Sequence, residues 1–172
     1  MIRWLMAILI LAPTMVHSAH SDHTLESMIQ WIQDNSAYTY GGQPLPRIEL
    51  HSADQICSEI FPDSEPHADC NIAGYFDHDT NLIVISDTVT EYMVEDHFYE
   101  TVLLHELVHF LQYYDGEYER AECKQALEKD AFALQDQWID EQGIDPEQKN
   151  DPLFVIFVTM CPGKDLMFGN TH

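Results

Sequence analysis

Basic side chains are scarce in this chain. Its 172 residues include 7 Lys+Arg against 30 Asp+Glu, which gives a formal net charge of −23. A surface with this charge repels nucleic-acid phosphates and anionic lipid, so the composition excludes both as partners. The acidic residues are scattered and form no D-x-[DN]-x-[DN]-G calcium loop. We interpret the charge as a solvated acidic surface, with a preference for basic substrates as the alternative.

Long apolar runs are absent as well. The most extended one, over residues 4–16, is shorter than the roughly 20 residues that cross a bilayer. It follows a short positive segment, and small-residue cleavage sites come at its end and just after it. The sequence therefore predicts a signal peptide over residues 1–21 and one domain over residues 22–172. We expect the mature domain to be periplasmic or extracellular, without membrane contact; an uncleaved N-terminal anchor is the alternative.

Cysteine is sparse, and C-x-x-C spacing is missing. The even set is Cys57, Cys70, Cys123 and Cys161, which argues against a thiolate metal cluster and suits disulfides in an oxidising compartment. Four cysteines allow three pairings, which the sequence does not distinguish. We favour Cys57–Cys70 and Cys123–Cys161, because the first would close an acidic, proline-containing loop and the second would pin the C-terminal segment. Free buried cysteines are the alternative.

The chain has no Ser-His-Asp order and no glycine-rich phosphate loop, but residues 105–109 read H-E-x-x-H. Two imidazoles four positions apart on a helix lie on the same face, where they can share one Zn²⁺. Glu106 stands beside the first imidazole and can reach a water on the metal without binding the metal itself. The motif therefore predicts His105 and His109 as metal ligands and Glu106 as the general base.

A catalytic zinc site needs a third protein ligand. We expect the first helix to end near Gly116 and a second, antiparallel helix to cover residues 119–140. Glu128 lies about as far beyond the turn as the histidine pair lies before it, and a small residue three positions later leaves room for close helix packing. Glu122 is rotated onto another face, and Asp130 points nearly opposite to Glu128. These positions favour Glu128 as the third ligand.

These two segments together resemble the gluzincin zinc metallopeptidases, especially their small minimal forms. The pattern of that group is H-E-x-x-H on one helix and E-x-x-A on the next, which residues 105–109 and 128–131 match. The resemblance implies a zincin-like α+β fold, in which a small, mostly antiparallel sheet packs on the active-site helix and a second antiparallel helix. It also implies three zinc ligands and a general base: His105, His109, Glu128 and Glu106.

The resemblance extends over roughly residues 74–140 and has one departure. Residues 75–86 resemble the hairpin that precedes the active-site helix in such proteins, where a strand pairs with extended substrate. We expect residues 82–86 to be that edge strand. Many gluzincins have an Asp four positions after the ligand Glu, which orients a ligand histidine; here that position is Phe132. The groups that orient the ligands are therefore unassigned.

The remaining patterns predict an α+β domain around this helix pair. Apolar periodicity, alternation and turn residues indicate a helix at 25–32, a strand at 47–51, a hairpin of strands at 75–77 and 82–86, an active-site helix within 91–114, and a C-terminal helix after Asp151-Pro152.

The functional expectation is an exported zinc metallopeptidase, whose partner is a peptide or protein substrate. Glu106 would assist the attack of zinc-bound water on the peptide bond. A non-catalytic zinc-binding or peptide-binding module and a cell-wall peptide amidase remain alternatives. Two further sets of side chains could assist catalysis, although we prefer surface or packing roles for each member: His51, His67, His78 and His97, and Tyr113, Tyr114 and Tyr118.

Overall fold

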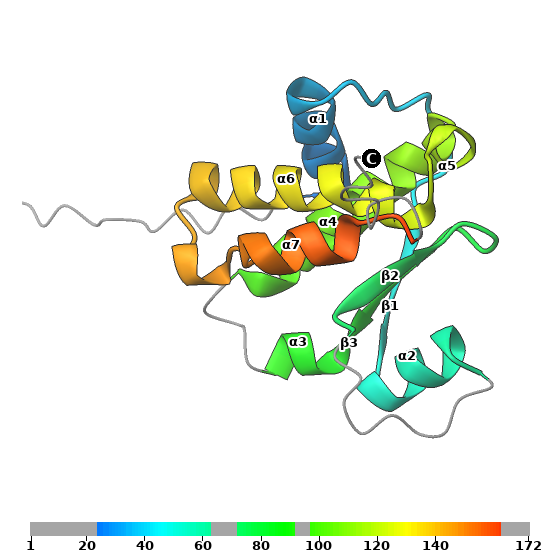
Figure 1. Cartoon of the computed structure of the whole chain (residues 1–172), viewed down its shortest axis with the longest axis vertical. Coiled ribbons are helices and arrows are strands. Elements are labelled where there is room, and N and C mark those ends of the chain that lie inside the picture. The colour runs from blue at the N-terminus through cyan, green and yellow to red at the C-terminus, as the bar shows by residue number, and fades with distance from the viewer. Residues whose placement is uncertain (1–23, 63–71, 92–96, 163–172) are drawn as a thin grey trace, which may run out of the picture.

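The computed structural model describes residues 24–62, 72–91 and 97–162 as an α+β arrangement in which a small sheet lies beside a group of helices (Figure 1). In chain order the elements are α1 (Leu25–Asn35), β1 (Arg47–His51), α2 (Ala53–Ile60), β2 (Gly74–Asp77), β3 (Leu82–Ser86), α3 (Asp87–Glu91), α4 (Phe98–Tyr114), α5 (Glu117–Arg120), α6 (Lys124–Gln142), the 3₁₀ turn η1 (Pro146–Gln148) and α7 (Pro152–Thr159).

Helix α4 forms the centre of the molecule. Every residue from Thr101 to Gln112 is buried, because α4 packs against the sheet on one side and against α1 and α6 on the other. Its apolar side chains join Trp138 of α6 and Ile29 of α1 in one core. The helix ends at Tyr114, and Gly116 follows with φ +77°, a left-handed conformation that glycine adopts without strain. The predicted end of the active-site helix is thus confirmed.

The sheet has three strands in the order β1-β3-β2. β3 pairs with β1 in parallel and with β2 in an antiparallel hairpin, so the sheet is mixed and not mostly antiparallel as expected. The prediction that residues 82–86 form an edge strand is wrong. Their side chains are mostly buried apolar groups, which suits a strand with a neighbour on both sides, and β2 is the edge strand nearer to α4.

The second helix of the predicted pair is shorter than expected. Residues 119–140 do not form one helix: α5 ends at Arg120, and α6 begins at Lys124 after an extended Cys123. α6 then runs back beside α4 (Figure 1). Gln112 near the end of α4 contacts Leu127 near the start of α6, whereas His105 contacts Gln135 further along α6. The antiparallel packing of the two helices is confirmed.

Most other expected elements are present. α1, β1, the β2–β3 hairpin and α7 are confirmed, and Asp151 caps α7 by accepting hydrogen bonds from the Leu153 and Phe154 backbone N–H groups. α2 was not predicted, although its signal is in the sequence: Ser52 and Gln55 form a reciprocal capping box. Among the described residues, no helix combines the length and apolar character that crossing a bilayer requires.

The predicted disulfide between Cys123 and Cys161 is confirmed. It ties the start of α6 to the residues just after α7, so the C-terminal helix is held against the second helix of the pair. Cys57 also takes part in a disulfide, whereas its predicted partner Cys70 lies outside the described residues. The predicted signal peptide over residues 1–21 lies outside them too.

Replacing both cysteines of the described disulfide with serine tests this tie. The bond closes a segment with a sequence separation of 38, and a loop of that size lowers the entropy of the unfolded chain by an equivalent of about 4 kcal/mol at 25 °C. We expect Cys123→Ser/Cys161→Ser to lose up to that free energy of unfolding in urea denaturation. Hydrogen exchange should accelerate in α7 more than in α1; equal acceleration in both helices would contradict the tie.

Candidate metal centre

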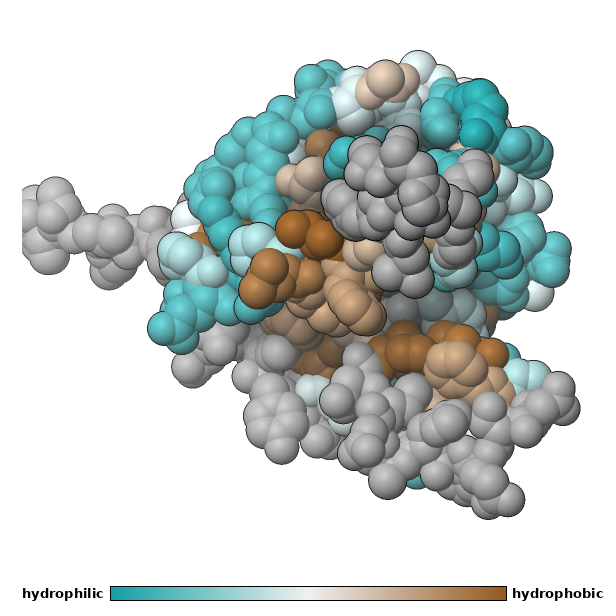
Figure 2. Space-filling view, in the orientation of Figure 1, coloured by the Kyte–Doolittle hydropathy of each residue, from teal (hydrophilic) through white to brown (hydrophobic). Residues whose placement is uncertain are grey.

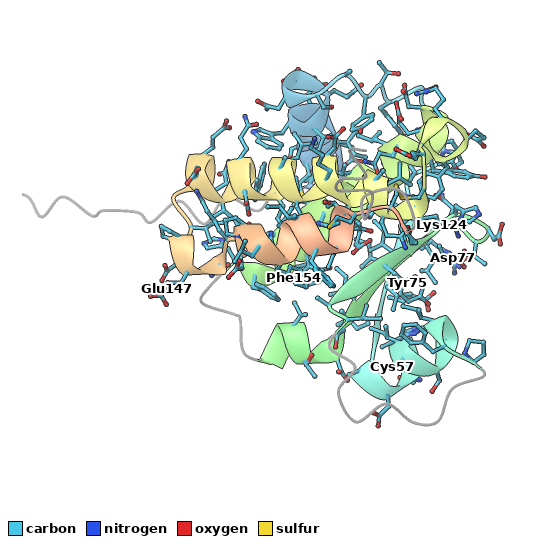
Figure 3. The ribbon with its side chains drawn as sticks, viewed as in Figure 1. Cys57, Tyr75, Asp77, Lys124, Glu147 and Phe154 are labelled. Carbon is cyan, nitrogen blue, oxygen red and sulfur yellow. A yellow bond between two sulfur atoms is a disulfide. The ribbon has the colours of Figure 1, made fainter. Side chains whose placement is uncertain are left out.

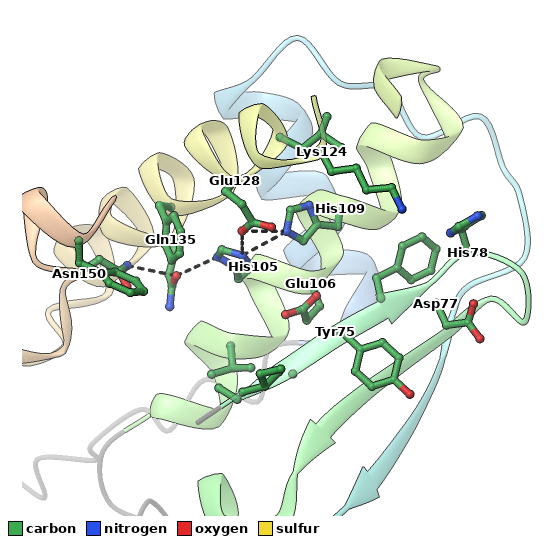
Figure 4. Close-up of a pocket in the computed structure, with 18 of the residues that line it drawn as sticks. Tyr75, Asp77, His78, His105, Glu106, His109, Lys124, Glu128, Gln135 and Asn150 are labelled. Atoms are coloured by element: carbon green, nitrogen blue, oxygen red, sulfur yellow. Dashed lines mark hydrogen bonds and ion pairs between the residues drawn. The ribbon is translucent and has the colours of Figure 1, made fainter. Parts of the chain in front are cut away.

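The two histidines of the H-E-x-x-H motif and Glu128 converge on one point (Figure 4). The Nε2 atoms of His105 and His109 lie 3.2 Å apart. The Oε2 atom of Glu128 lies 3.1 Å from the first and 3.4 Å from the second. Both imidazoles are buried, being 8 % and 7 % exposed, whereas the carboxylate is partly open to the cleft. Two residues from α4 and one from α6 therefore present three donor atoms to a shared position.

The spacing of these atoms fits a tetrahedral metal ion. Ligands at the usual Zn–N and Zn–O distances of roughly 2.0–2.1 Å lie about 3.3 Å from one another at tetrahedral angles. The three observed separations bracket that value. Within the part of the chain that the structure describes, no fourth His, Cys, Asp or Glu joins the group. The set of two imidazoles and one carboxylate is therefore suited to a metal that keeps an open position.

Gln112 orients His109. Its Nε2 amide donates to the Leu127 backbone carbonyl at 2.9 Å, and a carbonyl can only accept. The other end of the amide, Oε1, therefore faces His109 Nδ1 at 2.8 Å and must accept from it. With the proton held on Nδ1, the lone pair of a neutral His109 lies on Nε2 and points to the shared position. Tyr38 extends this network by accepting from Gln112 and donating to Asp130.

Gln135 orients His105 in the same way from α6. Asn150 donates from Nδ2 both to the Asp136 carboxylate at 3.1 Å and to Gln135 Oε1 at 3.3 Å. The same Oε1 atom faces His105 Nδ1 at 3.1 Å and accepts from it. The neutral imidazole of His105 therefore also carries its lone pair on Nε2. Two glutamine amides thus take the orienting role that was unassigned from the sequence, while the Phe132 ring packs 4.7 Å from the His105 ring.

The electrostatics of the three donors favour a bound cation. Burial opposes ionisation of Glu128, but hydrogen bonds from His105 and His109 hold its pKa well below the ordinary range. Burial also opposes a charge on His109, yet its hydrogen bond to Glu128 and the charges of Glu106 and Glu128 raise its pKa to about 9. The position between the donors therefore attracts positive charge, which a divalent ion supplies more strongly than a shared proton.

Glu106 lies beside the three donors without joining them. It is 5 % exposed, and burial raises the pKa of its carboxyl, a change that the neighbouring imidazoles oppose and Glu128 reinforces. The backbone N–H of Phe76 in β2 faces this carboxylate and opposes the rise in its pKa. Gly74 allows this approach, because a Cβ atom there would meet Val102 at 3.1 Å and Glu106 at 3.4 Å. β2 can therefore lie close against α4 at the site.

A cleft of about 720 Å³ opens over this centre. The edge strand β2 forms one side and α6 the other, α4 forms the floor, and η1 and α7 close one end. In Figure 4 the donors lie in the middle, with Asn150 towards one end and Asp77, His78 and Lys124 towards the other. This volume is in the range of sites that bind small molecules or short peptide segments.

The family of the chain follows from its sequence as a whole. The model of a domain of unknown function, DUF6647, matches residues 17–167. The chain belongs to the DUF6647 family. The match covers all three donors and both orienting glutamines. No curated protein and no solved structure matches this DUF6647 chain.

The structure brings together all four predicted site residues of this DUF6647 chain: His105, Glu106, His109 and Glu128. Sequence reasoning missed the glutamines, although Gln112 follows His109 by three positions and Gln135 follows Glu128 by seven, both of which are same-face spacings on a helix. It also missed Gly74, whose close approach to α4 is a tertiary feature. Asp130 points away from the donors, as predicted.

The additional histidines and tyrosines divide into two groups. His51 binds Glu49 and Glu59 outside the cleft, and His97 pairs with Glu100. His67 lies outside the described residues. By contrast, His78 and Tyr118 line the cleft, with ring centres 5.8 Å apart.

Truncating the orienting glutamines should weaken metal binding. Loss of a group that orients a ligand histidine commonly costs 10- to 100-fold in metal affinity, and we expect Gln112→Ala and Gln135→Ala each to lower zinc affinity by about that factor. Competition with a chromophoric chelator measures it. Gln137→Ala is the control, because Gln137 lies on the same helix as Gln135 but binds Asn35 and Glu141 at the surface. If all three variants bind zinc as tightly as the wild type does, Gln112 and Gln135 have no role in orienting the ligands.

Proposed function

We propose that the protein is a zinc-dependent metallopeptidase of the gluzincin type with a zincin-like arrangement. The observation that carries the proposal is the convergence of His105, His109 and Glu128 at tetrahedral ligand spacing, with an uncoordinated Glu106 beside them. Two neutral imidazoles and a carboxylate form a donor set that catalytic zinc sites use. When bound, zinc would act as a Lewis acid that polarises the scissile carbonyl and activates water.

Glu106 is the proposed general base. Burial raises the pKa of its carboxyl above the ordinary value, which makes the carboxylate a stronger base for the proton of the attacking water. It would accept the proton of the attacking water and pass it to the leaving amine. The edge strand β2 borders the carboxylate, while Gln112 and Gln135 keep the two imidazoles turned towards the ion.

The edge of β2 is the proposed docking strand for the substrate backbone. In the antiparallel pair with β3, residue 73 accepts a hydrogen bond from residue 86, so alternate residues of β2 turn their backbone groups away from β3. Gly74 and Phe76 are those residues, and both line the cleft. An extended peptide can add to this edge and cross the metal centre.

Tyr118 is the proposed donor to the oxyanion. Burial and the negative charges of Glu106 and Glu128 raise its pKa to about 12, so the phenol stays protonated at neutral pH. Its ring packs against Tyr113 and lines the cleft. An O–H donor in the cleft would stabilise negative charge that develops on the carbonyl oxygen.

We further propose that the enzyme is exported. The predicted signal peptide over residues 1–21 and the Cys123–Cys161 disulfide are both typical of periplasmic or extracellular proteins.

Metal analysis and the Glu106→Gln variant test the catalytic assignment. Purified mature protein should contain stoichiometric zinc and cleave members of a mixed peptide library, and a chelator should abolish cleavage until zinc is restored. Glu106→Gln should keep the zinc and lose activity by about 10²- to 10⁴-fold, because it cannot accept the proton. Glu119→Gln, which changes an exposed carboxylate on α5, is the control. Full activity of the Glu106 variant would exclude this residue from the mechanism.

Tyr118→Phe tests the oxyanion donor. Loss of one such donor lowers kcat by about 10²- to 10³-fold, and we expect an effect of that order with little change in KM or zinc content. The control is Tyr114→Phe, because Tyr114 is 42 % exposed and packs against Phe110 outside the cleft. A larger change in KM than in kcat would assign Tyr118 to substrate binding.

A further inference from the structure

Two aromatic rings form a wall at one end of the cleft. Phe132 of α6 lies with its ring centre 4.7 Å from the His105 ring, and Phe154 of α7 lies 6.1 Å from Phe132. Both line the cleft, and Phe98 and Val102 of α4 continue the apolar surface along its floor. The wall therefore begins at a metal ligand and extends outward from it.

The wall depends on the fact that Gln135, and not the residue at position 132, orients His105. Gln135 holds His105 from one turn further along α6, so Phe132, whose ring meets the His105 ring edge to face, forms no hydrogen bond to it. An apolar ring at this position adds a surface for a ligand immediately beside the metal centre.

Phe154 extends that surface although it is 53 % exposed. Figure 2 shows apolar surface gathered over α7, and Figure 3 shows Phe154 on the side of α7 that is nearer to the sheet. An open aromatic ring in a concave site is a recurrent feature of ligand pockets, because a ligand that covers it removes apolar area from water.

Three contacts hold this part of the wall in place before any ligand binds. The Cys123–Cys161 disulfide anchors the end of α7, Asp151 caps its start, and Asn150 bonds to Gln135 and Asp136 of α6. A wall that is fixed in advance loses little entropy on binding, which favours a selective contact.

The opposite end of the cleft has a different chemistry. Asp77, His78 and Lys124 line it, so its surface is polar and charged (Figure 4). A substrate that crosses the metal centre would meet an apolar surface on one side of the scissile bond and a polar surface on the other.

We propose that Phe132 and Phe154 form a specificity subsite for a large apolar side chain next to the scissile bond. This inference rests on the proposed peptidase function. The position of the wall indicates its occupant. A peptide that pairs with β2 over the metal brings the side chains on either side of the reacting carbonyl closest to the His105 ring. Phe132 lies against that ring.

Two measurements test the subsite, one of which does not depend on catalysis. Cleavage of a mixed peptide library by the wild-type protein should show Phe, Leu or Met at one position that adjoins the cut bond. The zinc-loaded Glu106→Gln variant should bind a short peptide with Phe at its centre roughly 10- to 100-fold more tightly than the same peptide with Ala there.

Phe154→Ala is the variant that removes part of the wall, and Phe157→Ala is its matched control. Phe157 lies on the same helix, is 81 % exposed and does not line the cleft. Phe154→Ala should reduce the preference for Phe over Ala by about 10-fold at unchanged zinc content, whereas Phe157→Ala should leave it unchanged.

The two proposals fail in different ways. Cleavage by the wild type without an apolar preference, or an equal loss of preference in both phenylalanine variants, overturns the subsite and leaves the peptidase. Selective binding of the Phe peptide with no cleavage by the wild type overturns the peptidase and leaves the subsite.

Discussion

Two imidazoles are buried with their lone pairs directed at one point, and the rest of the structure depends on this constraint. Polar rings inside a helical core are costly unless every N–H finds a partner. The chain meets this requirement with amide oxygens from Gln112 and Gln135, which accept from Nδ1 and leave Nε2 directed at the shared position. Each amide is oriented by a group that can only accept, directly by the Leu127 carbonyl in one case and through Asn150 by the Asp136 carboxylate in the other.

This arrangement explains why α4 is buried from Thr101 to Gln112 and why three other segments converge on it. α6 brings Glu128 and Gln135, the residues before α7 bring Asn150, and the edge of β2 lies against Glu106. The packing of these segments on α4 therefore fixes the orientation of the polar side chains around the two imidazoles. Neutral amides do this without adding further negative charge beside the donors, where Glu106 and Glu128 already lie.

The same arrangement makes the cleft asymmetric. Because the orienting contact to His105 comes from Gln135, position 132 carries an aromatic ring that meets Phe154 across the α6–α7 interface. The other end retains charged side chains. The residue that orients His105 and the residue that forms the apolar wall, positions 135 and 132, thus lie on the same face of α6.

The four central residues and most helices and strands could be predicted from the sequence, because each depends on local spacing or on a short turn between neighbouring elements. The Cys123–Cys161 pair belongs to one of the three pairings that the sequence allowed, and the packing of α7 against α6 selects it. One correction concerns the relation between distant segments, because β1 joins β3 from the far side and makes it central. The other is local, because the chain is extended at Cys123 and α6 starts only at Lys124. The sequence by itself determined which side chains can bind a metal. Only the tertiary structure decided which groups orient them, which strand borders the cleft and which rings line it, because those contacts join residues far apart in the chain and leave no periodic signal.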